Sequence, residues 1–338
     1  MIDSAYSAFG STDPVHDPVG ERVRWFCPWV IDGREVLEQA LNRVEEVQQN
    51  ARVSRITFRV VSQGELGPEC VGVLAGRGFG VEARLPVNGS NDLVMSYIGW
   101  CDAGRQSVPS DIQSEQEMLK CIMAQPRKGP SEVRGEFRKL DEFRLERVES
   151  GDISPADINR LVWMHREAFP TFPYAFESKL ELMLSKPDTY LMVQVRSKRN
   201  QQIYSFSNLE LNDIVLSNGS HLRLGEYDNT MRIANCPEHG AVKGLGAILR
   251  LELALQAARH GVDLCHAESR AGLVAINAIS YHTGMVYGGT LDKHLFISGE
   301  SDIEYDAPLP CQSMNVWYFN RFSLAQLAVA TNQGTRFQ

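Results

Sequence analysis

The sequence predicts an α/β fold in which a mixed, mostly antiparallel sheet is flanked by helices. Segments with apolar residues at helical spacing alternate along the chain with short segments rich in β-branched and aromatic residues. The order helix, strand, helix, glycine with an apolar residue, and two strands occurs twice. The chain has 338 residues, of which 43% are hydrophobic and 22% charged, which is enough for about two globular domains.

The N-terminal unit is expected to begin near Val23, after a flexible arm over 1–22 in which Gly and Pro occur among polar residues. Apolar residues at helical spacing predict a helix over 35–49. Alternating β-branched and aromatic residues predict a strand over 55–61. A second helix and two strands are expected over 68–75, 80–85 and 93–98. These elements make up a first domain over 23–101.

Prolines flank one amphipathic helix over 114–124, so residues 102–136 are expected to connect two domains. A second domain is expected over 137–322, with a tail over 323–338. It is expected to open with a strand, two helices and three strands, over 143–148, 154–169, 177–185, 189–195, 202–211 and 227–235. A long helix, a strand, a helix and two strands follow over 246–260, 262–267, 273–282, 286–291 and 313–319.

The end of the second domain repeats the order of elements of the first. The pairs Gly78-Phe79 and Gly284-Met285 each follow the second helix of their unit and precede two strands. The two units match in pattern more than in letters. An ancient duplication and a chance similarity of pattern both stay open.

Charge and cysteine content exclude several classes of protein. The formal net charge is −8 and no long block of Lys and Arg occurs, so the electrostatic signature of a nucleic-acid binder is missing. The 7 cysteines are scattered without a C-x-x-C pair, which is typical of reduced thiols. No secretory signal and no run of about eighteen apolar residues is present, so we expect a cytoplasmic protein that does not cross a membrane.

Residues 239–247 (HGAVKGLGA) form a glycine-rich turn that follows a predicted strand and opens the long helix. Glycines let the backbone approach a ligand closely, and the free N–H groups of a helix start can hold a pyrophosphate. Two glycines before a helix are also common in plain turns. The turn therefore needs its context to indicate a function.

That context resembles the GNAT acetyltransferases, in which a strand runs into an R/Q-x-x-G-x-G/A turn, followed by helix, strand, helix, Gly-aromatic and two strands. Residues 227–320 follow this order. Over 140–320 the chain is most similar to the beta-lysine N-acetyltransferase group, whose members also carry a comparable leading domain. The resemblance rests on 169–174 (FPTFPY), 226–229 (EYDN), Ile276-Asn277, 287–291 (YGGTL) and 313–318 (SMNVWY).

The resemblance implies a GNAT fold with an N-terminal partial GNAT-like domain. It also implies transfer of an acetyl group from acetyl-CoA, or another acyl-CoA, to the amine of a small amino-acid-like substrate such as a diamino acid, within a ternary complex. The residues implied to bind the cofactor are Ile233, Ala234, Asn235, Lys243, Gly244, Leu245, Gly246, Ala247 and Asn277. Ala241 stands where the family's turn usually begins with Arg or Gln, so that contact is missing or supplied by Lys243.

Acetyl transfer needs a neutral amine, whereas a free alkylamine has a pKa of about 10.4, so a carboxylate must accept a proton. Glu226 is the first candidate because it matches the acidic position of the beta-lysine group. Further acids beside the expected cofactor site, and two aromatic residues expected to cover the substrate, are Glu210, Asp228, Glu268, Phe172 and Tyr174. Solvated strand-end carboxylates and plain core packing are the alternatives.

Two residues are candidates for the general acid. Many GNAT enzymes use a tyrosine four residues before the glycine that follows the second helix. In this chain that position is Ser280, and Tyr281 is its neighbour, about 100° further around the helix. Both are therefore candidates for a catalytic role.

Two other functions stay open: an acyltransferase of the same type that uses a longer acyl-CoA or an acyl-carrier protein, and a non-catalytic binding protein of the same fold. A zinc site formed by Cys236 with His239 and Cys265 with His266 is a further alternative. Adjacent Cys and His rarely ligate zinc together, so no metal is expected. The expected partner is a small-molecule amine, with no nucleic acid and no membrane, and a homodimer is left open.

Overall fold

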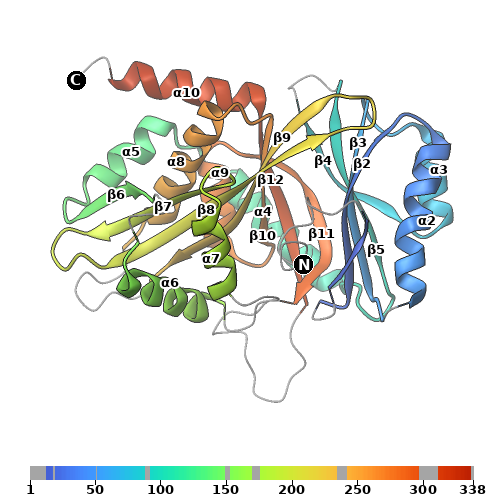
Figure 1. Cartoon of the computed structure of the whole chain (residues 1–338), viewed down its shortest axis with the longest axis horizontal. Helices are drawn as coiled ribbons and strands as arrows, with labels where there is room; N and C mark the ends of the chain where they lie inside the picture. The colour runs from blue at the N-terminus through green and yellow to red at the C-terminus, as the bar shows by residue number, and fades with distance from the viewer. Residues whose placement is uncertain are drawn as a thin grey trace.

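Two runs of helices and strands, joined by a helical connection, build the protein (Figure 1). The computed structural model describes residues 13–17, 20–50, 52–87, 92–148, 153–169, 176–233, 242–296 and 311–335. The N-terminal run is β1 (Val15–Asp17), β2 (Arg22–Ile31), α2 (Arg34–Asn50), β3 (Arg55–Ser62), α3 (Pro68–Gly76), β4 (Gly80–Pro86) and β5 (Val94–Cys101). The connection is α4 (Pro109–Met123) and α5 (Pro130–Arg138).

The C-terminal run begins with one strand, two helices and three strands: β6 (Phe143–Arg147), α6 (Pro155–Ala168), α7 (Phe176–Ser185), β7 (Tyr190–Ser197), β8 (Ile203–Val215) and β9 (His221–Arg232). It continues with α8 (Leu245–Arg259), β10 (Leu264–Arg270), α9 (Val274–His282), β11 (Val286–Phe296), β12 (Cys311–Asn320) and α10 (Arg321–Thr335). The described strands form one 12-stranded sheet in the order β1-β2-β3-β5-β4-β11-β12-β10-β9-β8-β7-β6. This confirms the predicted fold class: a mixed, mostly antiparallel sheet flanked by helices.

The two halves share one strand topology. In each, a parallel pair is followed by two antiparallel pairs, giving the orders β2-β3-β5-β4 and β9-β10-β12-β11. The repeated order of elements predicted from the sequence is therefore present in the structure. The halves join edge to edge where β4 pairs with β11 at Ala83 and Gly289. A side chain at Gly289 would collide with the Glu82 carbonyl oxygen, so this close approach requires glycine.

An inner core fills the space between the two halves and defines the inner face of the sheet. It is made of side chains from both halves, among them Phe26, Val61, Leu85, Met95, Leu224, Leu264, Leu291 and Val316. Side chains alternate between the two faces of a strand. A residue two positions before or after one of these core residues therefore also lies on the inner face. Helices α6 and α7 also cover the inner face, beside β8 and β9, with a separate apolar core.

The outer face carries the remaining helices. Helices α2 and α3 cover the N-terminal half at one end of the molecule, and α8, α9 and α10 cover the C-terminal half (Figure 1). Four elements were not predicted from the sequence: β1, β2, α5 and α10. The connection thus holds two helices where one was expected, and a helix occupies most of the expected C-terminal tail.

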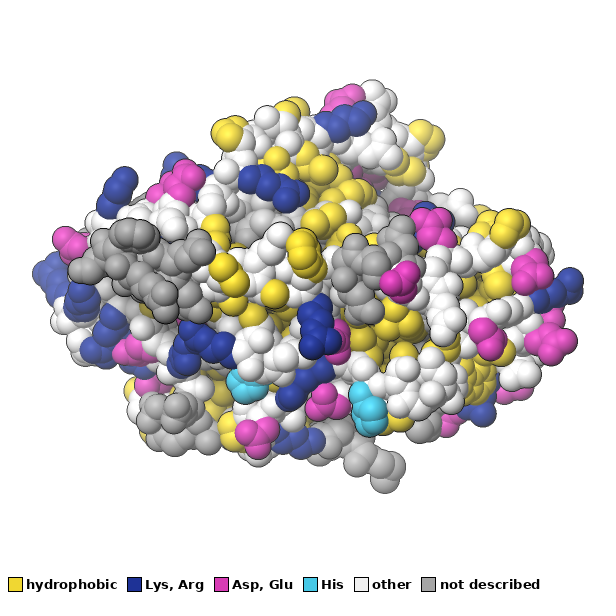
Figure 2. All heavy atoms as spheres, turned by 90° about the horizontal axis from the view of Figure 1, so that it is seen from above, with side chains coloured by type: hydrophobic (Ala, Val, Ile, Leu, Met, Phe, Trp, Pro, Cys, Tyr) yellow, Lys and Arg dark blue, Asp and Glu magenta, His cyan; other side chains and the backbone are white. Residues whose placement is uncertain are grey.

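Charge, helix length and possible metal ligands can be followed over the described residues. On the face seen in Figure 2, Lys and Arg side chains are interspersed with Asp and Glu. Among the described helices, none is both long and apolar enough to span a membrane. In the same described part of the chain, no group of three or more His, Cys, Asp and Glu is placed to hold a metal ion.

Candidate active site

Strands β9 and β10 part halfway along their length. They pair in parallel only from Leu224–Tyr227 to Leu264–Ala267. Beyond this point β9 stays paired with β8, and β10 stays paired with β12. A register shift in β9 between Tyr227 and Thr230 lies at the same place and bends the strand. Within the described residues, the edge of β9 beyond Tyr227 that faces β10 therefore has no strand partner, and an extended ligand can pair with it.

The start of α8 lies against this parted segment. Gly244 is the N-cap with φ of 88°, and no side chain of the described residues caps the helix. A Cβ at Gly246 would lie 2.6 Å from Ile279 Cδ1 and 3.9 Å from Thr230 Cγ2, so the first turn packs between α9 and β9. Its N–H groups have no intrahelical acceptor, and the helix dipole favours an anion there. Lys243 is exposed next to this turn.

The other residues expected to bind a cofactor are placed as follows. Leu245 is buried in the outer core, and Ile233 and Ala247 are half-buried beside it. Ala234 and Asn235 lie outside the described residues, as does Ala241 of the turn. The structure thus places Gly246 against the parted segment of β9 at Thr230, and Ile233 directly after the end of β9.

Asn277 of α9 is buried and bonded entirely within the protein. Its Nδ2 donates to the carbonyls of Arg270, at 2.9 Å, and Leu273, at 2.7 Å. Its Oδ1 accepts from Asn315 Nδ2 at 3.0 Å and from Trp317 Nε1 at 2.9 Å. The bond to Leu273 lies within the start of α9, and the other three hold α9 to β10 and β12. In this arrangement the side chain positions the helix and does not present a group to a ligand.

Ser280 and Tyr281 also point their polar atoms at backbone carbonyls. The Ser280 hydroxyl is buried and donates to Ile276 O at 3.2 Å. The Tyr281 hydroxyl lies 2.8 Å from Met123 O and 2.9 Å from Gln125 O, at the end of α4. Tyr281 therefore ties α9 to the connection between the halves.

Glu226 lies on the inner face of β9, on the opposite side from Tyr227, whose hydroxyl donates to Arg250 O of α8. Arg59 of β3 in the N-terminal half donates to Glu226 Oε2 at 3.2 Å. The Glu226 side chain is 26% exposed and that of Arg59 is 8% exposed. Burial opposes the charge of Arg59, but Glu226 raises its pKa above the usual value. The predicted base is thus held by a buried cation and still reaches solvent.

His266 and Glu268 of β10 share the inner face with Glu226. His266 Nδ1 lies 3.2 Å from the Tyr97 hydroxyl of β5, and His266 is the direct strand neighbour of Glu226. Burial lowers the pKa of His266 to about 4, so the imidazole is neutral at pH 7. Burial raises the pKa of Tyr97 well above its usual value, so its hydroxyl keeps the proton. His294 Nε2 of β11 lies 3.2 Å from Glu268 Oε2.

His294 is fixed from the N-terminal half. Arg22 Nη1 lies 2.9 Å from His294 Nε2, and Thr57 Oγ1 lies 3.1 Å from Nδ1. Nε2 therefore lies within reach of a donor, Arg22, and of an acceptor, Glu268. Burial lowers the pKa of His294 to about 3, with Glu268 opposing the shift and Arg22 and Arg55 adding to it. The histidine is therefore neutral at pH 7.

Glu210 and Asp228 form a second group beside Glu226, under α7. Buried Lys179 lies 2.8 Å from Glu210 Oε2 and 3.4 Å from Asp228 Oδ2. Glu210 is the direct cross-strand neighbour of Glu226. Burial raises the pKa of Glu210 above its ordinary value, with Lys179 opposing the shift. Phe172 and Tyr174, which were expected to cover the substrate, lie outside the described residues.

The structure adds Arg59, Tyr97 and Lys179 to the residues expected from the sequence, and it places His266, considered there only as a zinc ligand, beside Glu226. None of them belongs to a motif. The signal that could have found Arg59 is its place in the strand segment 55–61 (RITFRVV), where a charged residue at a buried position needs an opposite charge. Such a pattern indicates a partner without saying which one.

The N-terminal half lacks the parting seen between β9 and β10. Its equivalent strands β2 and β3 pair from Arg22–Arg55 to Ile31–Ser62, with one irregularity between Phe26 and Val30. The edge that an extended ligand would need is thus already paired. Only the C-terminal half has this feature among the described strands.

Known proteins were compared with the chain by sequence and by structure. No family model matches the sequence. No curated protein matches it either. Among solved structures, a ribosomal-protein-alanine N-acetyltransferase from Brucella melitensis is 14% identical, with a TM-score of 0.39, over 52% of this chain and 99% of that one.

Two further solved structures have similar values. Arabidopsis thaliana NAA60 with a bisubstrate analogue is 13% identical, with a TM-score of 0.39, over 52% of this chain and 98% of that one. Spermidine N-acetyltransferase from Vibrio cholerae in complex with CoA and spermine is 15% identical, with a TM-score of 0.38, over 55% and 99%. These TM-scores are below 0.5, so nothing about the activity of this chain follows from the likeness.

Proposed function

We propose that the chain is an acetyl-CoA-dependent N-acetyltransferase of the GNAT type that acts on the amine of a small amino-acid-like substrate. The observation that carries the proposal is the parting of β9 from β10 with the uncapped start of α8 beside it. The parted edge offers backbone groups to an extended amide-containing arm, and the helix start offers N–H groups to a pyrophosphate. Coenzyme A joins these two chemical features in one molecule.

The fit of the donor is supported by two details of the turn. Gly244 has a positive φ, and a Cβ built there meets no atom of the described residues within 4 Å, so no described side chain blocks the approach of a ligand to this backbone. Lys243, exposed beside it, adds a positive charge to the helix start. Gly244, Leu245 and Gly246 would hold the pyrophosphate through their backbone, with Lys243 in place of the family's usual Arg or Gln.

Glu226 is proposed as the general base. Acetyl-CoA supplies the acyl group as a thioester, and the acceptor must reach it as a neutral amine. Glu226 takes the amine proton, the new C–N bond replaces the C–S bond, and the thiolate leaves and takes a proton from solvent. Arg59 holds the carboxylate in place through their 3.2 Å ion pair. Ser280 and Tyr281 are proposed as structural residues, because their hydroxyls bond to backbone carbonyls.

The charged side chains on the inner face beside Glu226 favour an acceptor that carries both an ammonium group and a carboxylate. Glu226, Glu268 and Asp228 are 26%, 18% and 19% exposed and would attract an ammonium group. Arg24 shares this face of β2 with inner-core Phe26, two residues along the strand. Burial and Arg22 lower the pKa of Arg24 to about 10, so it remains a cation at pH 7 that suits a carboxylate.

One observation favours the non-catalytic alternative: the two hydroxyls at the expected position of the general acid are engaged in the fold. Turnover decides between the two. The purified chain is incubated with acetyl-CoA and a panel of amino acids and diamino acids, and products are detected by the mass increase of one acetyl group. Acetylated product from the wild-type chain, and none without protein, supports the enzyme. Saturable binding of acetyl-CoA without product would favour the binding protein.

The same assay shows whether the chain prefers acetyl-CoA or a longer acyl donor. The altered turn, with Ala241 in place of Arg or Gln, is what favours that rival. Parallel reactions with acyl-CoA donors of increasing chain length, and with an acylated carrier protein, report the preferred donor by the mass of the product. The proposal requires acetyl-CoA to give the highest kcat/KM.

A further inference from the structure

Arg250 of α8 is a buried cation with no acidic partner among the described residues. Only 2% of the residue is exposed. Its Nη1 lies 3.5 Å from the Met285 sulfur, which is a weak acceptor, and its Nε has no hydrogen-bond partner in the described part of the chain. The guanidinium stacks on Tyr227, with Cζ 4.4 Å from the ring centroid. Because arginine is almost never fully buried unless it is paired, this charge points to a group that binds beside it.

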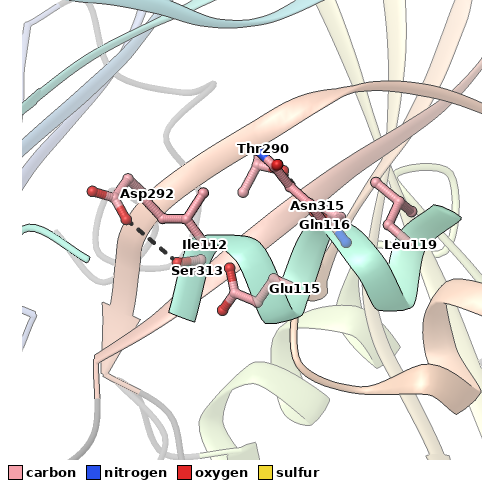
Figure 3. A pocket seen from close by; sticks show the side chains of 8 residues that line it. All are labelled: Ile112, Glu115, Gln116, Leu119, Thr290, Asp292, Ser313 and Asn315. Atoms are coloured by element: carbon pink, nitrogen blue, oxygen red, sulfur yellow. Dashed lines mark hydrogen bonds between the residues drawn. The ribbon is translucent and has the colours of Figure 1, made fainter. Parts of the chain in front are cut away.

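The pocket between α4 and the strands β11 and β12 does not supply this partner (Figure 3). Its volume is about 220 Å³, and among its eight lining residues Thr290 and Asn315 bond to each other at 2.7 Å. Arg250 is not one of the eight. It lies instead over β9 and β10, where Tyr227 and Cys265 are close enough to act on its ionisation. A partner would therefore reach the guanidinium at these two strands.

Arg250 lies at the point where β9 and β10 part. Tyr227 is the last residue of β9 that pairs with β10, opposite Ala267. One helical turn before Arg250, Gly246 packs against Thr230, which lies beyond that point. Helix α8 therefore follows β9 from the parted segment at Thr230 back to the paired segment at Tyr227. Side chains of a helix lean toward its N-terminus, which brings the head of Arg250 toward the parted segment.

This placement matches the thioester end of the proposed donor. With the pyrophosphate at the start of α8, the arm of coenzyme A would run along the parted edge of β9 toward Tyr227, and its sulfur would come last. Glu226, the neighbour of Tyr227, lies on the opposite face of the sheet from Arg250. The proposed base and the buried cation would thus flank the reacting bond from the two faces.

We propose that Arg250 stabilises the sulfur of coenzyme A as it leaves, a role that rests on the proposed acetyltransferase function. The amine nitrogen bonds to the carbonyl carbon, the C–S bond breaks, and its electron pair stays on sulfur. The guanidinium faces this negative charge and keeps its own protons, and the sulfur takes a proton from solvent afterwards. Burial lowers the pKa of Arg250 to about 10, so it is still a cation at pH 7.

Such a cation would do the work of a general acid without transferring a proton. This agrees with the two hydroxyls at the expected position of the acid, because those of Ser280 and Tyr281 are bonded to backbone carbonyls. The negative charge that a general acid would neutralise is instead balanced by a fixed positive charge. The reaction then needs a proton acceptor on one face and a cation on the other.

The test is a pH titration of the thiol of coenzyme A bound to the full chain, followed by the ultraviolet absorbance of the thiolate. A coenzyme A analogue that lacks the sulfur is the blank, which removes the signal of the protein's own cysteines. An opposite charge within about 4–6 Å lowers the pKa of an acid by roughly 1 to 3. We expect the pKa of the bound thiol to be lower by at least about 1 in the wild type than in Arg250→Met. Arg259→Met, at an exposed position of the same helix, is the matched control and should give the wild-type value.

Stability and rate separate this role from a structural one. Methionine fills much of the space of the arginine stem without its charge, so Arg250→Met should keep or raise the urea midpoint of unfolding. We expect kcat to fall at least about ten-fold, with the affinity for acetyl-CoA changed less than about two-fold. A lower midpoint together with an unchanged thiol pKa would show that Arg250 only supports the fold, and would overturn the proposal.

The same titration distinguishes failure of this proposal from failure of the function on which it rests. A wild-type chain that does not bind coenzyme A would contradict both. A chain that binds coenzyme A with the same thiol pKa in the wild type and in Arg250→Met would overturn the role of Arg250 alone. The coenzyme site would then stand without it.

Discussion

Arg59 of β3 and Glu226 of β9, which are 167 residues apart in the chain, form an ion pair of 3.2 Å across the inner face of the sheet. The pair joins the two halves at the residue proposed as the general base. Tyr97 of the N-terminal half reaches His266 of β10 in the same region. The N-terminal half therefore contributes side chains to the candidate site and does more than lengthen the sheet.

Replacing Arg59 should weaken both the fold and the activity. Arg59→Met removes the buried cation that holds Glu226, and we expect a loss of about 2 kcal/mol in the free energy of unfolding and a fall in kcat of about ten-fold. Urea unfolding and initial rates measure the two effects. Arg34→Met is the control, since its exposed pair with Glu38 should contribute less than about 0.5 kcal/mol. Equal effects of the two variants would contradict this role for Arg59.

Glu226→Gln should abolish proton acceptance and leave the donor site intact. We expect kcat to fall by roughly 10²- to 10⁴-fold, with the affinity for acetyl-CoA changed less than about two-fold. Steady-state rates and calorimetry on the same preparation separate the two quantities. Glu210→Gln is a useful comparison, because Glu210 is buried against Lys179 and should affect stability more than rate. A Glu226→Gln enzyme with wild-type kcat would rule out Glu226 as the base.

Tyr281→Phe tests whether this hydroxyl is structural. It lies 2.8 Å from Met123 O and 2.9 Å from Gln125 O, so its removal should cost about 1 kcal/mol of unfolding free energy. We expect kcat to stay within about three-fold of the wild type, since the hydroxyl points at α4. A general acid would instead lose at least about 100-fold in kcat at unchanged stability. A loss of that size in kcat at unchanged stability would contradict the structural role of Tyr281.

Stability should fall as the pH is lowered from about 6.5 to about 4. Burial lowers the pKa of His165 and His266 to about 4 and that of His294 to about 3, whereas the unfolded value is about 6.5. In this window the unfolded chain binds protons that the folded chain excludes, so the free energy of unfolding rises with pH. Three such sites give a slope of up to about 4 kcal/mol per pH unit.

Denaturant unfolding at pH 7.0 and pH 5.0 measures this slope. His165→Phe retains an aromatic ring against Phe176, on which His165 stacks at 4.2 Å, and removes one of the three sites. Its slope should be about two thirds of the wild-type slope. A free energy of unfolding that does not change between the two pH values would show that these histidines are not held neutral by burial.

Local patterns predicted most of the fold. The helical spacing of apolar residues over 35–49 and 246–260 located α2 and α8 to within one or two residues. By contrast, β2 was not predicted because its segment RVRWFCPWVI mixes charges and a proline into a buried strand. Arg22 pairs with nearby Asp17 and also bonds to His294, which is 272 residues further along the chain and cannot be part of a local pattern.

The candidate site was predictable where it depends on backbone shape. The glycine turn before α8 and the acid at Glu226 were expected, and the structure brings them to neighbouring parts of β9 and α8. Arg59, Tyr97 and Lys179 were not expected, because each meets its partner through the pairing of distant strands and helices. The engagement of Asn277 with Asn315 and Trp317 likewise depends on how α9 packs on β12.

The central claim is that the parted strands and the start of α8 form a coenzyme A site, and calorimetric titration with acetyl-CoA tests it most directly. Gly244→Glu places a negative charge at the helix start, where a Cβ meets no atom of the described part of the chain within 4 Å. Gly219→Glu is the matched control, since Gly219 also has a positive φ and open surroundings but lies in a distant exposed turn. We expect saturable binding to the wild type and to Gly219→Glu, reduced at least ten-fold in Gly244→Glu. No binding to the wild type, or equal binding to both variants, would contradict the account.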